Sequence, residues 1–256
     1  MVKKSFQSEA KNNKNIMKKI NWQIIRLILI LGFVIFLYSF SIKRNNSRKL
    51  TKSEVVFVGA NDLFVKQETV NNMLIDYNET ALSIKKENLD LLKLEKTIDK
   101  QPMIEKSEVF VTIDGVLKAV VKQKTPIARL CNENESYYID YQGKFMPLSD
   151  CFTARVPVIS GEINKENSQQ LFDVFRKIFD DEFLKKNIIG IQILSNGSLK
   201  MKNRNNDFDI YFGNPINYEE KFKNYKAFYQ KASEDKTLDN YKIINLQFTQ
   251  QVVCTK

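Results

Sequence analysis

Three cysteines carry the most reactive chemistry in this 256-residue chain, because the sequence contains no histidine. Without histidine there can be no Ser-His-Asp triad, Cys-His nucleophile pair or His-based zinc site. Cys-x-x-Cys spacing is also absent, so neither thiol exchange nor zinc binding is indicated. Cys131 and Cys151 bracket a predicted hairpin around Tyr138. Outside the cytoplasm they would either form a disulfide or remain two free buried thiols, with Cys254 left over.

Carboxylates and lysines are the other groups that could do acid–base work. The densest acidic run, Asp180-Asp181-Glu182, lies in a charge-mixed helical segment, where a solvated face is the expected role. Only eight glycines are present, and none form a phosphate-binding loop. We therefore expect a protein that is not an enzyme and binds no metal or cofactor. A membrane-anchored cell-envelope hydrolase of unknown substrate stays open as the alternative.

One segment is apolar enough to cross a membrane. Residues 27–42 carry no charge, and the predicted transmembrane helix covers residues 22–42 after a tail at 1–21. Arg26 can snorkel to the headgroups, and Trp22 suits the interface. A cleaved signal peptide would show the same order of basic leader and apolar core. The bulky apolar core and the Lys43-Arg44 that follows favour the uncleaved anchor instead.

The charge is concentrated around this anchor. Residues 1–49 hold eleven basic residues and one acidic residue, so they carry the whole formal net charge of +10. The remainder is neutral, which excludes nucleic-acid binding through a basic folded domain and leaves membrane lipid as the partner of the basic flanks. The positive-inside bias is slight, but a short tail before a large C-terminal part favours a cytoplasmic N-terminus.

After a linker at 43–53, residues 54–124 read as a small α+β domain of order β-α-α-β-β. The expected elements are a strand at 54–58, an amphipathic helix at 68–77, a helix capped by Asp90 and stopped by Pro102, and strands at 107–113 and 116–123. Asp114-Gly115 between the last two strands predicts a two-residue type I′ hairpin.

Residues 125–256 predict a mainly antiparallel sheet with two or three helices. Strands are expected at 127–130, 137–140, 144–147, 156–159, 188–194, 199–202, 208–212 and 241–248. Gln142-Gly143 and Asn196-Gly197 mark tight hairpins. Helices are expected at 166–179 and from Asn217, whose side chain would form a capping box with Glu220.

Five short motifs occur in an order that resembles the FtsQ/DivIB family of bacterial division proteins. They are Val56-Phe57-Val58-Gly59-Ala60-Asn61, Gln101-Pro102-Met103-Ile104 with Val109, Val121-Lys122-Gln123-Lys124-Thr125-Pro126-Ile127-Ala128-Arg129, Tyr138-Ile139-Asp140-Tyr141-Gln142-Gly143-Lys144, and Ile244-Asn245-Leu246-Gln247-Phe248. Gln123 stands where the family commonly has Glu, and Gln247 and Phe248 replace the usual Arg and Tyr. The resemblance implies a cytoplasmic tail, one span, a POTRA domain at 54–124 and a β domain at 125–256.

The resemblance also implies a scaffold of the bacterial divisome in the inner membrane, with its C-terminal domain in the periplasm at the septum. Its partners would be FtsB/DivIC-like and FtsL-like single-span coiled-coil proteins, which help position septal peptidoglycan synthesis. β-Augmentation on a terminal edge strand is the mechanism that this sequence offers. The candidate edge, with Phe248 as its aromatic anchor, comprises Asn245, Leu246, Gln247, Phe248, Thr249, Gln250, Gln251, Val252 and Val253.

Other division proteins would dock on the POTRA domain, where Ile104 and Val109 are the candidate contacts and core packing is the alternative. Two rival classes are weaker. A POTRA-bearing outer-membrane translocation protein would need a long β-barrel after residue 125. An endoplasmic type II glycoprotein would use the Asn-x-Ser/Thr sites at Asn45, Asn78, Asn134 and Asn196, which arise readily by chance in so Asn-rich a chain.

Overall fold

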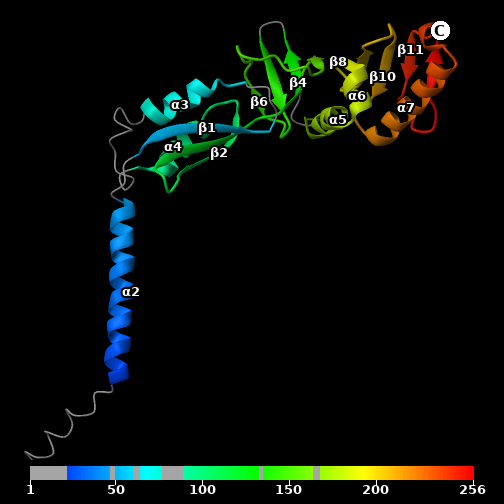
Figure 1. The fold of residues 1–256 in the computed structure, drawn as a ribbon. Coiled ribbons are helices and arrows are strands. Elements are labelled where there is room, and N and C mark those ends of the chain that lie inside the picture. The colour runs from blue at the N-terminus through cyan, green and yellow to red at the C-terminus, as the bar shows by residue number, and fades with distance from the viewer. Residues whose placement is uncertain (1–21, 47–49, 60–63, 77–88, 133–134, 164–167) are drawn as a thin grey trace, which may run out of the picture.

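The computed structural model describes residues 22–46, 50–59, 64–76, 89–132, 135–163 and 168–256. The predicted tail at 1–21 lies outside these residues. Helix α2 (Trp22–Asn46) stands apart from the rest of the chain as a single long rod (Figure 1). Its 25 residues reach about 37 Å, enough to cross a hydrocarbon core of about 30 Å. Its apolar side chains are exposed, and within the described chain it is the one helix long and apolar enough to span a membrane.

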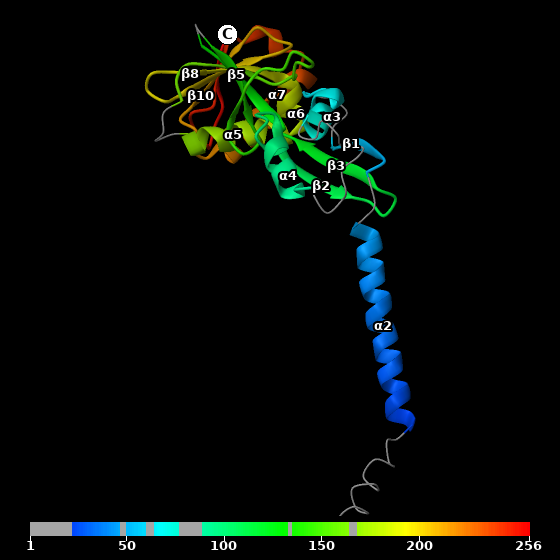
Figure 2. The same ribbon diagram turned by 90° about the vertical axis from the view of Figure 1, so that its left-hand side faces the viewer.

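A three-stranded sheet follows, in the order β1-β3-β2. Strand β1 runs parallel to β3, and β2 pairs antiparallel with β3. Helices α3 and α4 pack against this sheet (Figure 2). The bounds of these elements are β1 Lys52–Val58, α3 Gln67–Asp76, α4 Leu91–Asp99, β2 Ile104–Val111 and β3 Val116–Gln123.

The small domain has a core of its own, built from the periodicity of its two helices. Val70 and Leu74 of α3 and Leu94 and Ile98 of α4 are fully buried against the sheet. The Asp90 side chain accepts a hydrogen bond from the Lys93 backbone N–H at 3.0 Å, which confirms the predicted cap.

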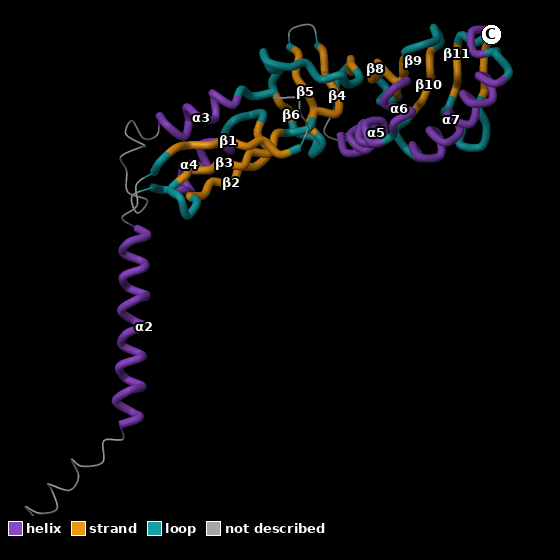
Figure 3. Tube along the Cα trace, viewed as in Figure 1, coloured by secondary structure: helices purple, strands orange, loops and turns teal. Residues whose placement is uncertain are grey.

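The larger sheet has nine strands in the order β12-β11-β10-β9-β8-β7-β4-β5-β6. Five of its eight strand pairs are antiparallel, and three are parallel: β10 with β11, β7 with β8 and β4 with β7. Figure 3 shows these strands following one another along the long axis of the domain. Their bounds are β4 Pro126–Cys131, β5 Ser136–Asp140, β6 Phe145–Met146, β7 Val158–Ser160, β8 Ile188–Ile193, β9 Leu199–Asn203, β10 Asp209–Gly213, β11 Ile243–Asn245 and β12 Val253–Thr255.

Helices α5 (Ser168–Asp180), α6 (Glu182–Asn187) and α7 (Tyr218–Glu234) pack against this sheet around one apolar core, and η3 (Leu238–Asn240) follows α7. The fold is therefore the expected α+β class. The predicted capping box at Asn217 is wrong. Asn217 has a φ of 50° and makes no side-chain cap hydrogen bond, because its left-handed backbone differs from the extended conformation that a capping residue normally adopts.

All three predicted hairpins form, but each has a longer loop than the two-residue turn expected at Asp114-Gly115. The backbone N–H bonds from Thr112 to Val116, Asp140 to Lys144 and Leu194 to Ser198 each enclose three residues. In every loop the third residue is a glycine with φ near +80°. This is a type I turn followed by a left-handed residue, a geometry that glycine adopts without strain.

Gln123 helps to join the two domains and lies just before the point where the chain passes from one to the other. The Gln123 side-chain carbonyl accepts hydrogen bonds from the Phe64 and Val65 backbone N–H groups, at 2.8 and 3.2 Å. Phe64 then packs into a small cluster with Tyr138 and Met146 of the larger domain. Its carbonyl accepts the Ser149 hydroxyl at 2.6 Å. Gln123 thus fixes the segment that docks the small domain onto the large one.

Gln123→Leu is expected to lower the free energy of unfolding by about 2–3 kcal/mol, because it leaves two largely buried N–H groups without an acceptor. Gln123→Glu keeps both acceptor contacts and should unfold close to the wild type. Chemical denaturation of the three proteins measures the difference. Equal stability of the Leu and Glu variants would contradict the role given to the side-chain oxygen.

Asp181 joins α6 to α7. Its carboxylate caps α6 through the Phe183 and Leu184 N–H groups and forms an ion pair with Lys226 of α7. Burial raises the pKa of Asp181, but the Lys226 hydrogen bond and the cap N–H groups outweigh it, and the net pKa is lowered.

A carboxyl with a lowered folded-state pKa stabilises the fold above its unfolded pKa of about 3.9, and this contribution is lost as the pH falls through the folded-state value. Asp181→Asn keeps the cap and removes the ion pair. It should cost about 0.5–1 kcal/mol at neutral pH, a gap that closes in acid. Urea titrations across this pH range measure it, with Glu182→Gln on the exposed face as control. A gap that does not change with pH would contradict the linkage.

Candidate partner-binding edge of the large sheet

Side chains cap backbone groups on both edges of the small sheet. On β2, the Ser107 N–H donates to Asp99 Oδ1 at 2.7 Å and the Val109 N–H donates to Glu95 Oε1 at 2.8 Å, both from α4. On β1, the Val55 carbonyl accepts the Gln67 side-chain amide at 2.9 Å. These groups occupy positions that an added strand would need, so the small sheet is a poor template for augmentation.

The large sheet ends in β6 on one side. This strand is only two residues long. Met146 is buried, and the exposed Phe145 packs edge-on against Tyr137 with ring centroids 4.8 Å apart. So short a strand offers few backbone groups to a partner, which is a common way to blunt an edge.

Strand β12 forms the other edge and is the C-terminal segment of the chain (Figure 1). It pairs antiparallel with β11, with Val253 opposite Asn245 and Thr255 opposite Ile243. Cys254 packs against the core, whereas Val253 and Thr255 are exposed. Its other side has no neighbour in the described sheet. Of the four sheet edges, β12 is the one best suited to accept a strand.

The predicted edge over residues 245–253 is therefore wrong as a continuous strand. Asn245 belongs to β11, which is paired on both sides, and Leu246 is buried in the core. The Asn245 side chain accepts the Gln247 N–H at 2.9 Å, an Asx-turn that ends β11. The chain then turns back, and the edge is the strand that begins at Val253.

The connecting loop at 246–252 presents Phe248, whose side chain is 52% exposed. The loop is held beneath by Asn224 of α7, whose side-chain amide donates to the Thr249 carbonyl at 2.7 Å. Val252 packs against the core, while Gln247, Gln250 and Gln251 are exposed. Phe248 is thus an exposed aromatic in the loop that leads into the free edge.

Lys221 of α7 lies beneath the same loop and was not identified from the sequence. Its Nζ donates to the Phe212 and Asn214 carbonyls at 3.0 and 2.8 Å, and it is almost fully buried. Burial lowers the pKa of Lys221. It borders a hollow of about 330 Å³ beside Gln247 and Thr249. A lysine in an amphipathic helix is normally predicted to be exposed, so the sequence gives no sign that Lys221 is buried and bonded to two carbonyls.

Two further predicted sites lie elsewhere in the structure. Ile104 and Val109 are buried in the small-domain core, at 2% and 5% exposure, so they present no docking surface. All three cysteines are free thiols, and the Cys131–Cys151 disulfide is not formed. Cys131 ends β4 and contacts Ser136 Oγ at 3.2 Å, whereas Cys151 is exposed in the loop after β6.

The acidic run at 180–182 does not gather into a reactive pair. Asp180 accepts the Tyr141 hydroxyl, Asp181 pairs with Lys226, and Glu182 pairs with Lys186. Each carboxylate therefore has a structural partner of its own. Across the part of the chain that the structure describes, no cluster of three potential metal ligands occurs.

A family model described as "FtsQ/DivIB, C-terminal related" matches residues 125–255, which contain the whole nine-stranded sheet and both of its edges. The chain belongs to the FtsQ/DivIB family. No curated protein matched the chain. Membership in FtsQ/DivIB indicates a role in bacterial cell division, and the single apolar α2 fits a bitopic inner-membrane member of this family.

Asn224→Ala in this FtsQ/DivIB protein should free the loop at 246–252. Loss of one hydrogen bond to the Thr249 carbonyl is expected to cost about 1 kcal/mol and to speed amide hydrogen exchange at 247–252, with β9 unchanged. Exchange measured by mass spectrometry reports this directly. Lys223→Ala, an exposed neighbour on α7, is the control. Equal exchange in both variants would show that the loop does not depend on Asn224.

Proposed function

We propose that this protein is a bitopic scaffold of the division machinery, with a cytoplasmic N-terminus and a periplasmic C-terminal part. It binds FtsB/DivIC-like and FtsL-like coiled-coil proteins and helps position septal peptidoglycan synthesis. The observation that carries the proposal is β12, an exposed terminal strand at the end of a sheet whose family has a division role.

The binding mechanism is β-augmentation. An edge strand carries a row of backbone N–H and C=O groups that an incoming strand satisfies, while side-chain contacts select the partner. Val253 and Thr255 supply the exposed face of β12, and Phe248 supplies an aromatic surface in the loop that precedes this strand. Three strand residues give few hydrogen bonds, so most of the binding energy must come from such an anchor.

The anchor α2 assists binding by confining protein and partners to one membrane. Single-span partners in the same bilayer meet at a raised effective concentration, which strengthens an otherwise weak augmentation. The basic residues on both flanks of α2 would hold its ends at the anionic headgroups. A short edge and a membrane anchor thus form a consistent design for reversible assembly.

The small domain has the β-α-α-β-β order of a POTRA domain and would serve as a second docking surface for other division proteins. Ile104 and Val109 cannot be its contacts, because they are buried. Since both sheet edges of this domain are covered, such docking would use its helices or its loops rather than strand addition.

The test is binding of the full-length protein, in lipid nanodiscs, to the extramembrane domains of the two coiled-coil partners. Deletion of residues 253–256 should abolish binding, and Phe248→Ala should weaken it by about 30-fold, as for an aromatic hot spot of about 2 kcal/mol. Phe145→Ala is the matched control, because Phe145 is 54% exposed on the opposite edge of the same sheet.

Binding that survives the deletion would keep the scaffold and remove β12 as its site. Loss in Phe145→Ala would assign the partner to β6. A folded protein that binds neither partner would overturn the proposal.

A further inference from the structure

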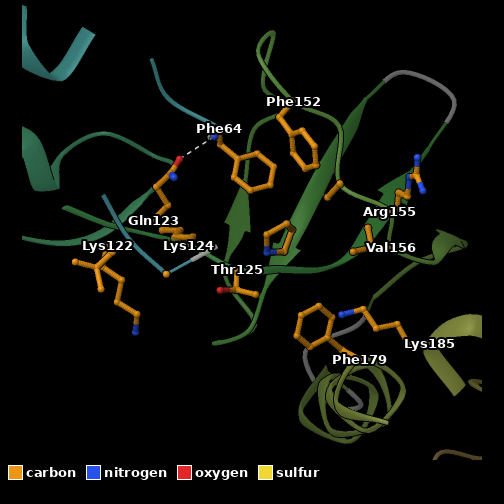
Figure 4. Close-up of a pocket in the computed structure, with 14 residues that line it drawn as sticks. Phe64, Lys122, Gln123, Lys124, Thr125, Phe152, Arg155, Val156, Phe179 and Lys185 are labelled. Carbon is orange, nitrogen blue, oxygen red and sulfur yellow. Dashed lines mark hydrogen bonds between the residues drawn. The ribbon is translucent and has the colours of Figure 1, made fainter. Parts of the chain in front are cut away.

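A groove of about 540 Å³ lies where the small domain meets the large one. One wall comes from the end of β3 and the segment before α3, and the other comes from the loop between β6 and β7 and from α5 and α6. Figure 4 shows the lining side chains on either side of the chain crossing at Thr125, with the charged ends of Lys122 and Arg155 directed outward. The groove is far along the sheet from β12, since β4 and β5 lie near the opposite end of the strand order.

The described lining is cationic without any acidic residue. Lys122, Lys124, Arg155 and Lys185 line the groove, and no Asp or Glu is among the lining residues that the structure describes. This is a local feature, because the chain beyond residue 49 has a net charge of zero. The excess of positive charge in the groove is therefore not part of a generally basic surface.

Two of these cations already have carboxylate partners just outside the lining. Lys122 pairs with Glu105 at 2.9 Å, and Lys124 lies 3.9 Å from Asp140. Arg155 and Lys185 have no ion-pair partner among the described residues. An anionic ligand would find its uncompensated charge at these two positions.

Aromatic rings form the apolar part of the groove. Phe64 and Phe152 meet edge to face with centroids 5.2 Å apart, and Phe179 lies across from them with the Lys185 ammonium 3.9 Å from its ring centre (Figure 4). The Phe152 and Phe179 rings are half-buried, and the buried Phe64 borders the hollow. Such rings accept an apolar side chain, and the Lys185 ammonium already stacked on Phe179 can hold a carboxylate beside it.

We propose that this groove binds an extended, acidic segment of a partner protein. One aromatic or aliphatic side chain of that segment lies against Phe64 and Phe152, and its carboxylates lie beside Arg155 and Lys185. Charge complementarity favours an acidic segment over a basic or neutral one. The aromatic wall favours a segment with an apolar side chain over a polyanion that has none. The proposal does not depend on strand addition at β12.

Because the groove borders both domains, its occupant would also bridge them. Phe64 is held by the Gln123 side chain on the small-domain side and packs with Tyr138 on the large-domain side. A ligand resting on Phe64 therefore contacts the residue that docks the domains, and binding should favour the arrangement seen here.

The test uses the full-length protein in neutral-lipid nanodiscs and a short fluorescein-labelled peptide rich in glutamate with two phenylalanines. Fluorescence anisotropy should show saturable binding that is about tenfold weaker in an Arg155→Gln, Lys185→Gln double variant. A matched double variant, Lys96→Gln with Lys223→Gln, removes two exposed lysines that do not line the groove and should bind as the wild type does. A peptide with lysine in place of glutamate should not bind.

Equal weakening in both double variants would overturn the site, because it would mean general charge attraction. A polyglutamate peptide that binds as well as the phenylalanine-containing one would overturn the aromatic contact. No peptide binding together with groove-dependent pelleting on purified peptidoglycan would overturn the peptide as occupant and assign the groove to a glycopeptide. Phe248→Ala, which alters only the β12 region, should leave peptide binding unchanged, so failure here is separable from failure of the scaffold proposal.

Discussion

A strand at the edge of a sheet leaves half of its backbone hydrogen-bonding groups without a partner, and this constraint organises the two sheets that follow α2. The small sheet meets it with side chains: Glu95 and Asp99 of α4 cover β2, and Gln67 covers β1. The large sheet meets it on one side by ending in a two-residue strand. Only β12 carries exposed strand residues at an edge with no such cover in the described structure. The distribution of covered and uncovered edges is what singles out one surface for a partner.

The junction between the domains also depends on a side chain that bonds backbone groups. The Gln123 oxygen accepts two backbone N–H groups and thereby sets the position of Phe64, which enters the core of the neighbouring domain. The same Gln123 lines the interdomain groove as a neutral amide, and every charged residue in the described part of that lining is a cation. Gln123 therefore contributes both to domain docking and to the electrostatics of the groove.

The candidate acid–base groups of the acidic run and of α7 are held by structural partners. The carboxylates of the acidic run are each tied to a tyrosine or a lysine, and the buried Lys221 is bound to two carbonyls. The net charge lies in the flanks of the apolar helix, so the chain beyond residue 49 is neutral and charge-based contacts there must come from local surfaces. Two such surfaces, the β12 edge and the interdomain groove, lie at well-separated parts of the molecule.

The sequence by itself determined the elements whose cause is local. The uncharged run at 27–42 predicts the membrane helix, Asp90 predicts the start of α4, and the glycines after Asp114, Gln142 and Asn196 predict the three hairpins. Turn chemistry, capping and apolar periodicity act within a few residues, so they can be read from one segment at a time.

Only the tertiary structure decided which strand is free. The Asx-turn at Asn245 sends the chain back to place Val253, rather than Phe248, on the edge, and the burial of Ile104 and Val109 depends on helices that pack over them. Likewise, the Gln123 oxygen finds its donors 58 and 59 residues away. Edges, grooves and buried polar groups depend on partners distant in the chain, and no local pattern specifies those partners.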